Sequence, residues 1–352
     1  MDAAGRRWVV GGGAVLVVAI AFTVARAADD ESPTPPERRR APPPDRTLAA
    51  ARYGGNVAGV PEVVRVASDD TVWTLIRRDG HTRLARLEGR MLREVPLGGI
   101  EPTELVAGYG RLSPYLAYSA GRTVGALRRD GSDRGHTLVP GEARDVALDR
   151  FGTLWFTNRP RASLGTWDRR RLAEVAVPTS PRPHLDEIVL QGSGSSKLWF
   201  LDTRGRVGLI DPTGGGVRMF KLRGGLPSRG SSRLTAGFAG ATWYTTATGL
   251  GQISERGSRV FIKSLPGPPG ALTGGPDGNL WVAARRGPWL FRISPMGSVT
   301  RYMLDLPRNA RLRDIARDTP RGDLWLACAR PPALLQGADP GAALEASLTG
   351  VR

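Results

Sequence analysis

The chain has 352 residues, including 46 glycines and 28 prolines, and carries a formal net charge of +17. So much glycine and proline disfavours a helical protein, while an apolar share of 40% supports a folded core and excludes disorder over the whole length. The single cysteine, Cys328, excludes an intrachain disulfide, and three histidines leave too few ligands for a structural zinc site. Only three of the 50 basic residues are lysine, an arginine excess typical of a GC-rich genome.

The first 27 residues have the three parts of an export signal. Arg6 and Arg7 precede an apolar run over 8–24, which an Ala-Arg-Ala triplet follows. We expect cleavage after Ala27. Because the run is close to the lower limit for a membrane span, about 17 residues, the alternative is that residues 1–27 stay as a single membrane anchor. Both interpretations predict a secreted or cell-surface protein, outside the cytoplasmic membrane.

A linker is predicted next, over residues 28–50. Six of its 23 residues are proline, and it contains the run Arg38-Arg39-Arg40. This composition is typical of an extended, solvated tether. The folded domain is then expected over 51–352.

An internal repeat dominates the folded domain. A short segment that reads Leu-Trp-aromatic, or a close variant, recurs along the chain, with alanine in place of tryptophan in one copy. The marker positions are separated by 44, 38, 44, 44, 38 and 44 residues. They are Trp73, Ala117, Trp155, Trp199, Trp243, Trp281 and Trp325.

Each copy also contains further short segments with the pattern of strands. Turn residues precede the marker, an apolar-glycine step such as Leu164-Gly165 follows it, and a segment of alternating apolar and polar residues such as 217–220 comes last. Four short strands in about 42 residues, without helical periodicity, predict an all-β fold, a seven-bladed β-propeller of four-stranded blades. The outer strand of the last blade comes either from Ala342–Leu348 or from Ala51–Val57.

One repeat resembles a known family. The segments GPDGNLW at 275–281 and LFRISPMGSVT at 290–300 are similar to the repeat of the virginiamycin B lyase (streptogramin B lyase) family. The resemblance extends over roughly 55–350 and implies a seven-bladed propeller. It also implies a magnesium-dependent elimination that opens the ester ring of a cyclic depsipeptide.

The resemblance further implies which residues perform that elimination. In the family, a Glu-x-His-Gly-Ile segment leads into one blade, a glutamate follows the tryptophan of that blade by three residues, and a second histidine leads into the blade before it. A base and a metal or hydrogen-bond donor are needed because a proton next to a carbonyl is removed. The matching positions of this chain hold Pro268, Gly270, Ala284 and Ser232. The acid and base groups of the family are therefore not retained there.

A different blade offers a histidine and an acid. His184 precedes Trp199 by 15 residues, whereas Gly270 precedes Trp281 by 11, and Asp202 follows Trp199 by three. If a longer turn absorbs the difference, His184 and Asp202 point to the same mouth of the ring and are the candidates for catalysis. Alternatively, His184 is an exposed loop residue and Asp202 forms a turn.

The neighbouring blade adds polar residues at the same mouth. The ligand-binding candidates are Glu142, Arg144, Asn158, His184 and Asp202. Cys328 follows its tryptophan by three residues and is interpreted as a packing residue.

Loss of the family's acid and base groups favours a binding scaffold over an enzyme. We expect an exported propeller that binds a small molecule, an envelope polymer or a protein at one face of the ring. The alternative is a carbon-oxygen lyase of the virginiamycin B lyase type with a displaced site, and magnesium is expected only in that case. No other cofactor, no metal site and no nucleic acid partner are expected, and we expect a monomer.

Arginine runs occur in several connecting turns, at 77–78, 128–129, 169–171 and 285–286. They predict a basic rim that attracts anionic polymers or lipid surfaces. The alternative is an ordinary solvated surface in an arginine-rich protein.

Overall fold

The computed structural model describes residues 46–48, 50–55, 58–108, 115–178, 181–192, 195–214, 216–225, 234–237, 240–275, 278–317 and 323–338. The predicted export signal or anchor, linker residues 28–45 and the segment 342–348 lie outside the described residues. The chain divides into two compact units, 1–41 and 42–352, and every described residue belongs to the second. Within the described ranges, no helix has the length and apolar character needed to cross a membrane.

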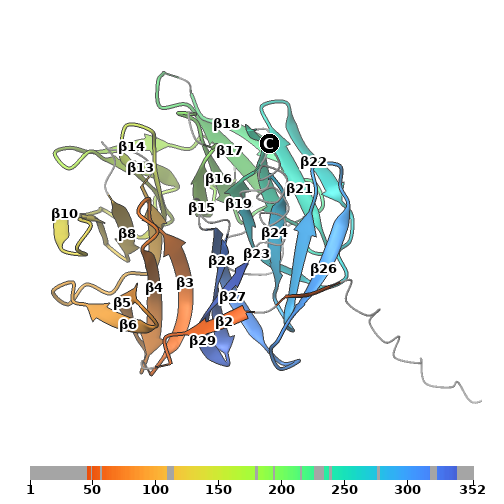
Figure 1. Ribbon diagram of the computed structural model, residues 1–352. Helices are drawn as coiled ribbons and strands as arrows, with labels where there is room; N and C mark the ends of the chain where they lie inside the picture. The colour runs from red at the N-terminus through yellow and green to blue at the C-terminus, as the bar shows by residue number, and fades with distance from the viewer. Residues whose placement is uncertain are drawn as a thin grey trace, which may run out of the picture. The chain divides into compact units, whose positions relative to one another are not determined.

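Seven sheets follow one another along the second unit, each built from an antiparallel run of strands consecutive in sequence, to which two of the sheets add an N-terminal strand (Figure 1). Blade 1 contains β3 (Val60–Val66), β4 (Val72–Arg78), β5 (His81–Glu88) and β6 (Met91–Val95), and blade 2 contains β7 (Glu104–Ala107), β8 (Leu116–Ala120), β9 (Thr123–Leu127) and β10 (Asp133–Leu138). Blade 3 contains β11 (Ala143–Leu148), β12 (Leu154–Asn158), β13 (Ser163–Trp167) and β14 (Leu172–Ala176), and blade 4 contains β15 (Leu185–Leu190), β16 (Leu198–Asp202), β17 (Arg206–Ile210) and β18 (Arg218–Lys221).

The last three blades repeat this order, and two of them gain a strand from the N-terminal side. Blade 5 contains β19 (Leu234–Ala236), β20 (Thr242–Thr245), β21 (Leu250–Ser254) and β22 (Gly257–Ile262), and blade 6 contains β23 (Pro269–Gly274), β24 (Leu280–Ala284), β25 (Trp289–Ile293) and β26 (Val299–Leu304), with β1 (Arg46–Leu48) parallel to β26. Blade 7 contains β27 (Arg311–Arg317), β28 (Asp323–Arg330) and β29 (Pro332–Ala338), with β2 (Ala50–Tyr53) antiparallel to β29. The predicted seven-bladed all-β propeller is confirmed.

The ring is closed by residues from both ends of the propeller. Of the two alternatives for the outer strand of blade 7, the N-terminal one is found, because Ala50 pairs with Gly337 and Tyr53 with Leu334. Tyr53 also stacks on Trp325 at 5.2 Å between ring centroids. Strands β1 and β2 begin within the range 28–50 that composition assigned to the linker, because these short strands carry no tryptophan marker.

The markers lie on the second strand of every blade, and in blades 2 to 5 the aromatic residue after the marker explains the glycine on the third strand. In blade 3, Phe156 pairs with Gly165 and its ring lies over the glycine, where an added Cβ would be 1.9 Å from Cζ. Blade 4 repeats this with Phe200 and Gly208. Blade 6 has the exchanged arrangement, with Phe291 on the third strand. One aromatic ring per strand pair therefore requires a small partner opposite it.

Seven clusters of buried side chains hold the blades together, each spanning one pair of adjacent blades. One of them joins Trp73 and Leu75 of blade 1 to Leu116 and Tyr118 of blade 2. The cluster between blades 7 and 1 completes the circle. Trp73, Trp199, Trp243 and Trp281 have no exposed surface. Because a four-stranded blade cannot cover its own faces, these large rings stabilise the contact between neighbours.

The strand order defines two faces of the propeller. We call the mouth face the one that carries the connections between blades and the turns between second and third strands. The opposite face carries the turns between first and second strands and between third and fourth strands. Successive innermost strands contact each other, and β27 contacts β3, so they surround a central axis, and we call the space between them the channel.

Candidate functional site

The channel is lined by acidic side chains at one repeated position of the innermost strands. In each of these blades, an apolar residue of the innermost strand pairs with the residue that follows the marker. The acid lies immediately before that apolar residue. Because this position is the same in each blade, the side chains lie at a similar level of the channel. They are Glu104, Asp145, Glu187 and Asp314.

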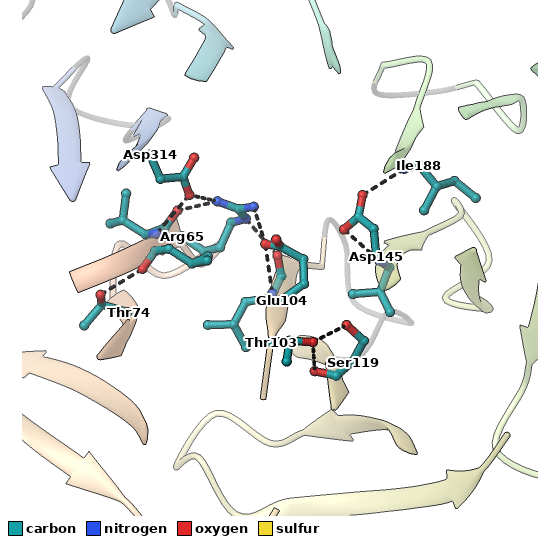
Figure 2. Close-up of polar contacts among 12 residues, drawn as sticks. Arg65, Thr74, Thr103, Glu104, Ser119, Asp145, Ile188 and Asp314 are labelled. Atoms are coloured by element: carbon teal, nitrogen blue, oxygen red, sulfur yellow. Dashed lines mark hydrogen bonds and ion pairs between the residues drawn. The ribbon is translucent and has the colours of Figure 1, made fainter. Parts of the chain in front are cut away.

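Arg65 of β3 connects two of these acids (Figure 2). Its Nη2 atom lies 2.7 Å from Glu104 Oε1, and its Nη1 atom lies 2.5 Å from Asp314 Oδ2. The guanidinium also donates to the carbonyl oxygens of Val64 and Leu105, at 2.7 and 2.8 Å. The side chain of Asp314 is fully buried, whereas that of Arg65 is 21% exposed. One arginine therefore joins blades 7, 1 and 2 at the place where the ring closes.

Two of the acids also accept hydrogen bonds from the next blade. The Val64 N–H donates to Asp314 Oδ2 at 3.1 Å, and the Ile188 N–H donates to Asp145 Oδ2 at 2.8 Å. Val64 and Ile188 hold the same position in their blades. The same contact thus occurs between blades 7 and 1 and between blades 3 and 4, and it satisfies backbone donors that face the channel.

Burial and neighbouring negative charges raise the pKa of two of the channel acids. Burial raises the pKa of Glu104 to about 7, with the charge of Asp314 acting in the same direction and Arg65 opposing it. Burial and the charges of Glu104 and Glu187 raise the pKa of Asp145 well above its ordinary value. The channel therefore contains two carboxyl groups whose protonation is favoured by their surroundings.

At the mouth face, Asp202 is held by its own blade. Its side chain is fully buried and pairs with Arg206, whose Nε atom lies 2.7 Å from Oδ2. The N–H groups of His184 and Arg204 donate to Oδ1 at 2.9 and 3.1 Å. The ring of His184 is on an exposed residue and has no hydrogen bond to Asp202 among the contacts of the described residues. The structure brings the backbone of His184 to Asp202, but not the imidazole.

The strand register identifies the position that His184 occupies. Leu185 pairs with Asp202, and Pro269 pairs with Ala284 in blade 6. His184 therefore corresponds to Pro268, and Asp186 corresponds to Gly270. The turn after β15 has only two residues more than the turn after β23, which is half of the difference in spacing to the tryptophan. An added Cβ at Gly270 would lie 2.7 Å from the Ala283 carbonyl oxygen.

The three candidates of blade 3 point in different directions. Arg144 donates from Nε to Asp186 Oδ1 at 3.3 Å, across the boundary between blades 3 and 4. Asn158 is buried and donates to Glu174 Oε1 of the outermost strand at 3.0 Å, and its Oδ1 atom has no hydrogen-bond partner. Glu142 is exposed. Of the five candidates, Glu142, Arg144 and His184 are exposed, whereas Asn158 and Asp202 are buried.

Sequence analysis missed the acids and the arginine inside the channel. Glu104, Asp145, Glu187 and Asp314 precede their markers by 13, 10, 12 and 11 residues, so they fall in one column only when the strand pairing is known, and the sequence alone offered no clear signal. Arg65 gave none, because it lies at a position that is occupied by Val189 in blade 4 and Ala147 in blade 3. Cys328 is fully buried, as expected of a packing residue, and burial raises the pKa of its thiol.

Comparison with known proteins supports the resemblance seen in the sequence. No model of a known protein family matches the chain. A virginiamycin B lyase of Nocardia farcinica is 27% identical over 164 residues, which are 46% of this chain and 54% of that protein. The chain thus matches about half the length of this curated relative.

Solved structures match more of the chain. A streptogramin B lyase structure has a TM-score of 0.67 at 18% identity and covers 82% of this chain and 96% of its own. A catalytically inactive variant of virginiamycin B lyase from Staphylococcus aureus with quinupristin has the same TM-score and identity, over 82% and 99%. The WD40 propeller of Doa1 has a TM-score of 0.61 at 12% identity, over 84% and 98%, so likeness of fold extends to unrelated functions. The chain is a seven-bladed β-propeller similar to the virginiamycin B lyases.

Proposed function

We propose that the chain is an exported propeller that acts as a binding scaffold at its mouth face and does not open cyclic depsipeptides. The observation that carries this proposal is the engagement of Asp202. A buried carboxylate that is paired with Arg206 and two backbone N–H groups is a poor proton acceptor, and the His184 ring does not face it. Asp202 and His184 are therefore not held as a catalytic pair. The other two histidines contact carboxylates at exposed sites, His81 with Glu101 at 2.6 Å and His136 with Asp133 at 2.5 Å, measured from Nδ1 to the carboxylate oxygen.

Magnesium does not fit the positions that the resemblance assigns to it. Magnesium prefers oxygen ligands in an octahedral arrangement. Pro268, Gly270 and Ala284 supply no side-chain oxygen, and both oxygens of Asp202 are already bonded. The described residues contain no group of three or more His, Cys, Asp or Glu side chains that could hold a metal ion. We therefore propose no role for magnesium in this chain.

The mouth is better suited to recognition. The Arg144 side chain is 49% exposed and its partner Asp186 is 14% exposed. Arg159 lies 3.9 Å from the same carboxylate. An ion pair at the rim of a channel can exchange one partner for a charged group of a ligand at little cost, because exposed pairs contribute only about 1 kcal/mol or less. A small molecule, an envelope polymer or a protein segment with charged groups fits this site.

Incubation with quinupristin and magnesium tests the proposal. The full chain is purified in mild detergent, and the linear product is sought by chromatography, with an active virginiamycin B lyase as the positive control. We expect the cyclic compound to stay intact. Turnover would overturn the proposal, and comparison of His184→Ala with His81→Ala, whose Nδ1 atom lies 2.6 Å from Glu101 Oε1, would show which histidine it requires.

Export is tested separately from binding. We expect the chain, expressed with its own N-terminus, to be recovered outside the cytoplasm. The intact mass then distinguishes cleavage after Ala27 from a retained anchor. Recovery of the whole chain in the cytoplasm would contradict the proposed location.

A further inference from the structure

The opposite face carries a dense group of arginines where blades 2 and 3 meet. The turn between β9 and β10 and the turn between β13 and β14 both lie on this face, and β10 approaches Trp167 at the end of β13, where an added Cβ on Gly135 would be 3.8 Å from the ring. Strands β10, β13 and β14 lie near one another in Figure 1. We call the following residues the arginine patch: Arg128, Arg134, Arg169, Arg170 and Arg171.

The acids of these two turns are directed to the backbone. Asp168 Oδ1 accepts from the N–H groups of Arg170 and Arg171, at 2.8 and 2.7 Å. Asp130 Oδ1 accepts from the N–H and hydroxyl of Ser132, at 2.9 and 2.7 Å. Among the ion pairs of the described residues, none includes a residue of the arginine patch. The turns are thus built by their acids. Arg128 donates from Nη1 to the Asp133 carbonyl oxygen at 2.5 Å, and the other four residues of the arginine patch are exposed.

Like charges are crowded in the arginine patch. Partial burial and the positive charges of Arg169 and Arg128 lower the pKa of Arg134. Arg169 itself has a φ of 77°, in the left-handed region where an arginine is uncommon. Repulsion of this kind costs stability in the free protein, and an anionic partner would relieve it.

The opposite face also exposes large apolar side chains at its turns. Phe151 is 56% exposed and Met296 91%, in turns of blades 3 and 6, and Met91, 62% exposed, begins the outer strand β6 directly after a turn of blade 1. Arg150 lies over the ring of Phe151 at 4.6 Å. The two other large exposed apolar residues among those described are on the outer strands β10 and β22. Apolar turn tips next to arginines are typical of surfaces that lie on a membrane.

The earlier expectation of a single basic rim is only partly met. The run 77–78 ends the second strand β4 and 285–286 follows the second strand β24, so both lie on the mouth face, whereas 128–129 and 169–171 follow third strands and lie on the opposite face. On the mouth face, Arg77 and Arg78 are paired with Glu62 and Glu94. Of the two arginine runs on the opposite face, only Arg129 has an ion pair among the described residues, with Asp69.

We propose that the opposite face docks on an anionic lipid surface, with the arginine patch on the phosphate headgroups and the Phe151 ring at the level of the headgroups. One guanidinium group can donate two parallel hydrogen bonds to two oxygens of a phosphate, so arginine is well suited to this contact. A soluble anionic polymer would use the charge but not the apolar tips, so the lipid surface accounts for more of the face. The proposal is independent of the binding function proposed for the mouth face.

Sedimentation with vesicles tests this docking. We use the fragment 42–352, because it contains all seven sheets, their clusters and both ring-closing strands, and because it lacks the apolar segment 8–24 that would itself enter a bilayer. Vesicles of phosphatidylcholine are compared with vesicles that also contain phosphatidylglycerol. We expect binding to the anionic vesicles only, weakened by salt.

Two variants with equal loss of charge locate the contact. The patch variant combines Arg134→Ala, Arg170→Ala and Arg171→Ala, and the control combines Arg122→Ala, Arg204→Ala and Arg286→Ala on the mouth face. At about fivefold per arginine near a lipid surface, the patch variant should bind on the order of a hundredfold more weakly, and the control should bind nearly as the parent does. Thermal melting verifies that both are folded.

The Phe151→Ser variant separates lipid from polymer. We expect this substitution to weaken vesicle binding but not the retention of soluble polyphosphate. Equal losses in the patch and control variants would overturn the proposal, because attraction would then be general. Binding to polyphosphate and vesicles that is equally insensitive to Phe151→Ser would overturn it in favour of a polymer.

Discussion

Replacing Arg65 by methionine is the most informative perturbation of the channel. Methionine keeps an apolar stem of similar length but removes both ion pairs. Asp314, with no exposed surface, then loses its ion pair, whereas the donation from the Val64 N–H to its Oδ2 atom stays. Removing one member of a buried ion pair costs about 3–5 kcal/mol, because the other charge stays buried without compensation. Since Arg65 is 21% exposed, we expect a loss at the lower end, about 3 kcal/mol.

The assay is urea unfolding followed by tryptophan fluorescence, with Arg77→Met as the matched control. Arg77 is on the adjacent strand, 57% exposed and 2.9 Å from Glu62, so its loss should cost less than about 1 kcal/mol. A second substitution, Asp314→Asn, should recover part of the loss in Arg65→Met by removing the buried charge. If Arg65→Met costs no more than Arg77→Met, the argument that this network holds blades 7, 1 and 2 together is refuted.

Three further predictions concern the fold and its pH dependence. Gly165→Ala should cost about 1–3 kcal/mol in urea unfolding, because its Cβ would lie 1.9 Å from Phe156 Cζ; no loss would contradict the tight contact. Tyr53→Ala should lower the thermal midpoint by removing the 5.2 Å contact with Trp325 at the ring closure, an effect absent if β2 closes the ring only through its backbone. Because the pKa of Glu104 is raised from 4.5 to about 7 on folding, stability should fall as pH rises between these values, and Glu104→Gln should flatten this part of the urea-midpoint profile.

The number of blades and their internal order were predictable from the sequence. The markers recur because every interface between blades needs one large ring, and packing of that ring is a local requirement that each repeat must satisfy by itself. The glycine opposite Phe156 follows the same rule, since the two residues are cross-strand partners. Seven such units also have the same neighbours on each side, so the closed ring follows from the repeat.

The ring closure and the state of the candidate site depended on contacts between distant segments. Whether residues 51–57 or 342–348 complete blade 7 is decided by pairing with β29, to which both candidate segments offer only a short, unmarked sequence. The sequence suggested His184 as the partner of Asp202. In the fold the partner is Arg206, because the turn between β16 and β17 brings its side chain back to Asp202.

Tertiary structure alone also distributes the charge. Arg65 pairs with Asp314, 249 residues away, because the first and last blades meet. The arginine runs look alike in the sequence, yet they belong to two faces because antiparallel strands end alternately on each side. The sequence by itself determined a repeat that closes into seven blades, since that depends on packing between like neighbours. Which charges are neutralised and which stay exposed was decided only when the closed ring brought distant side chains together.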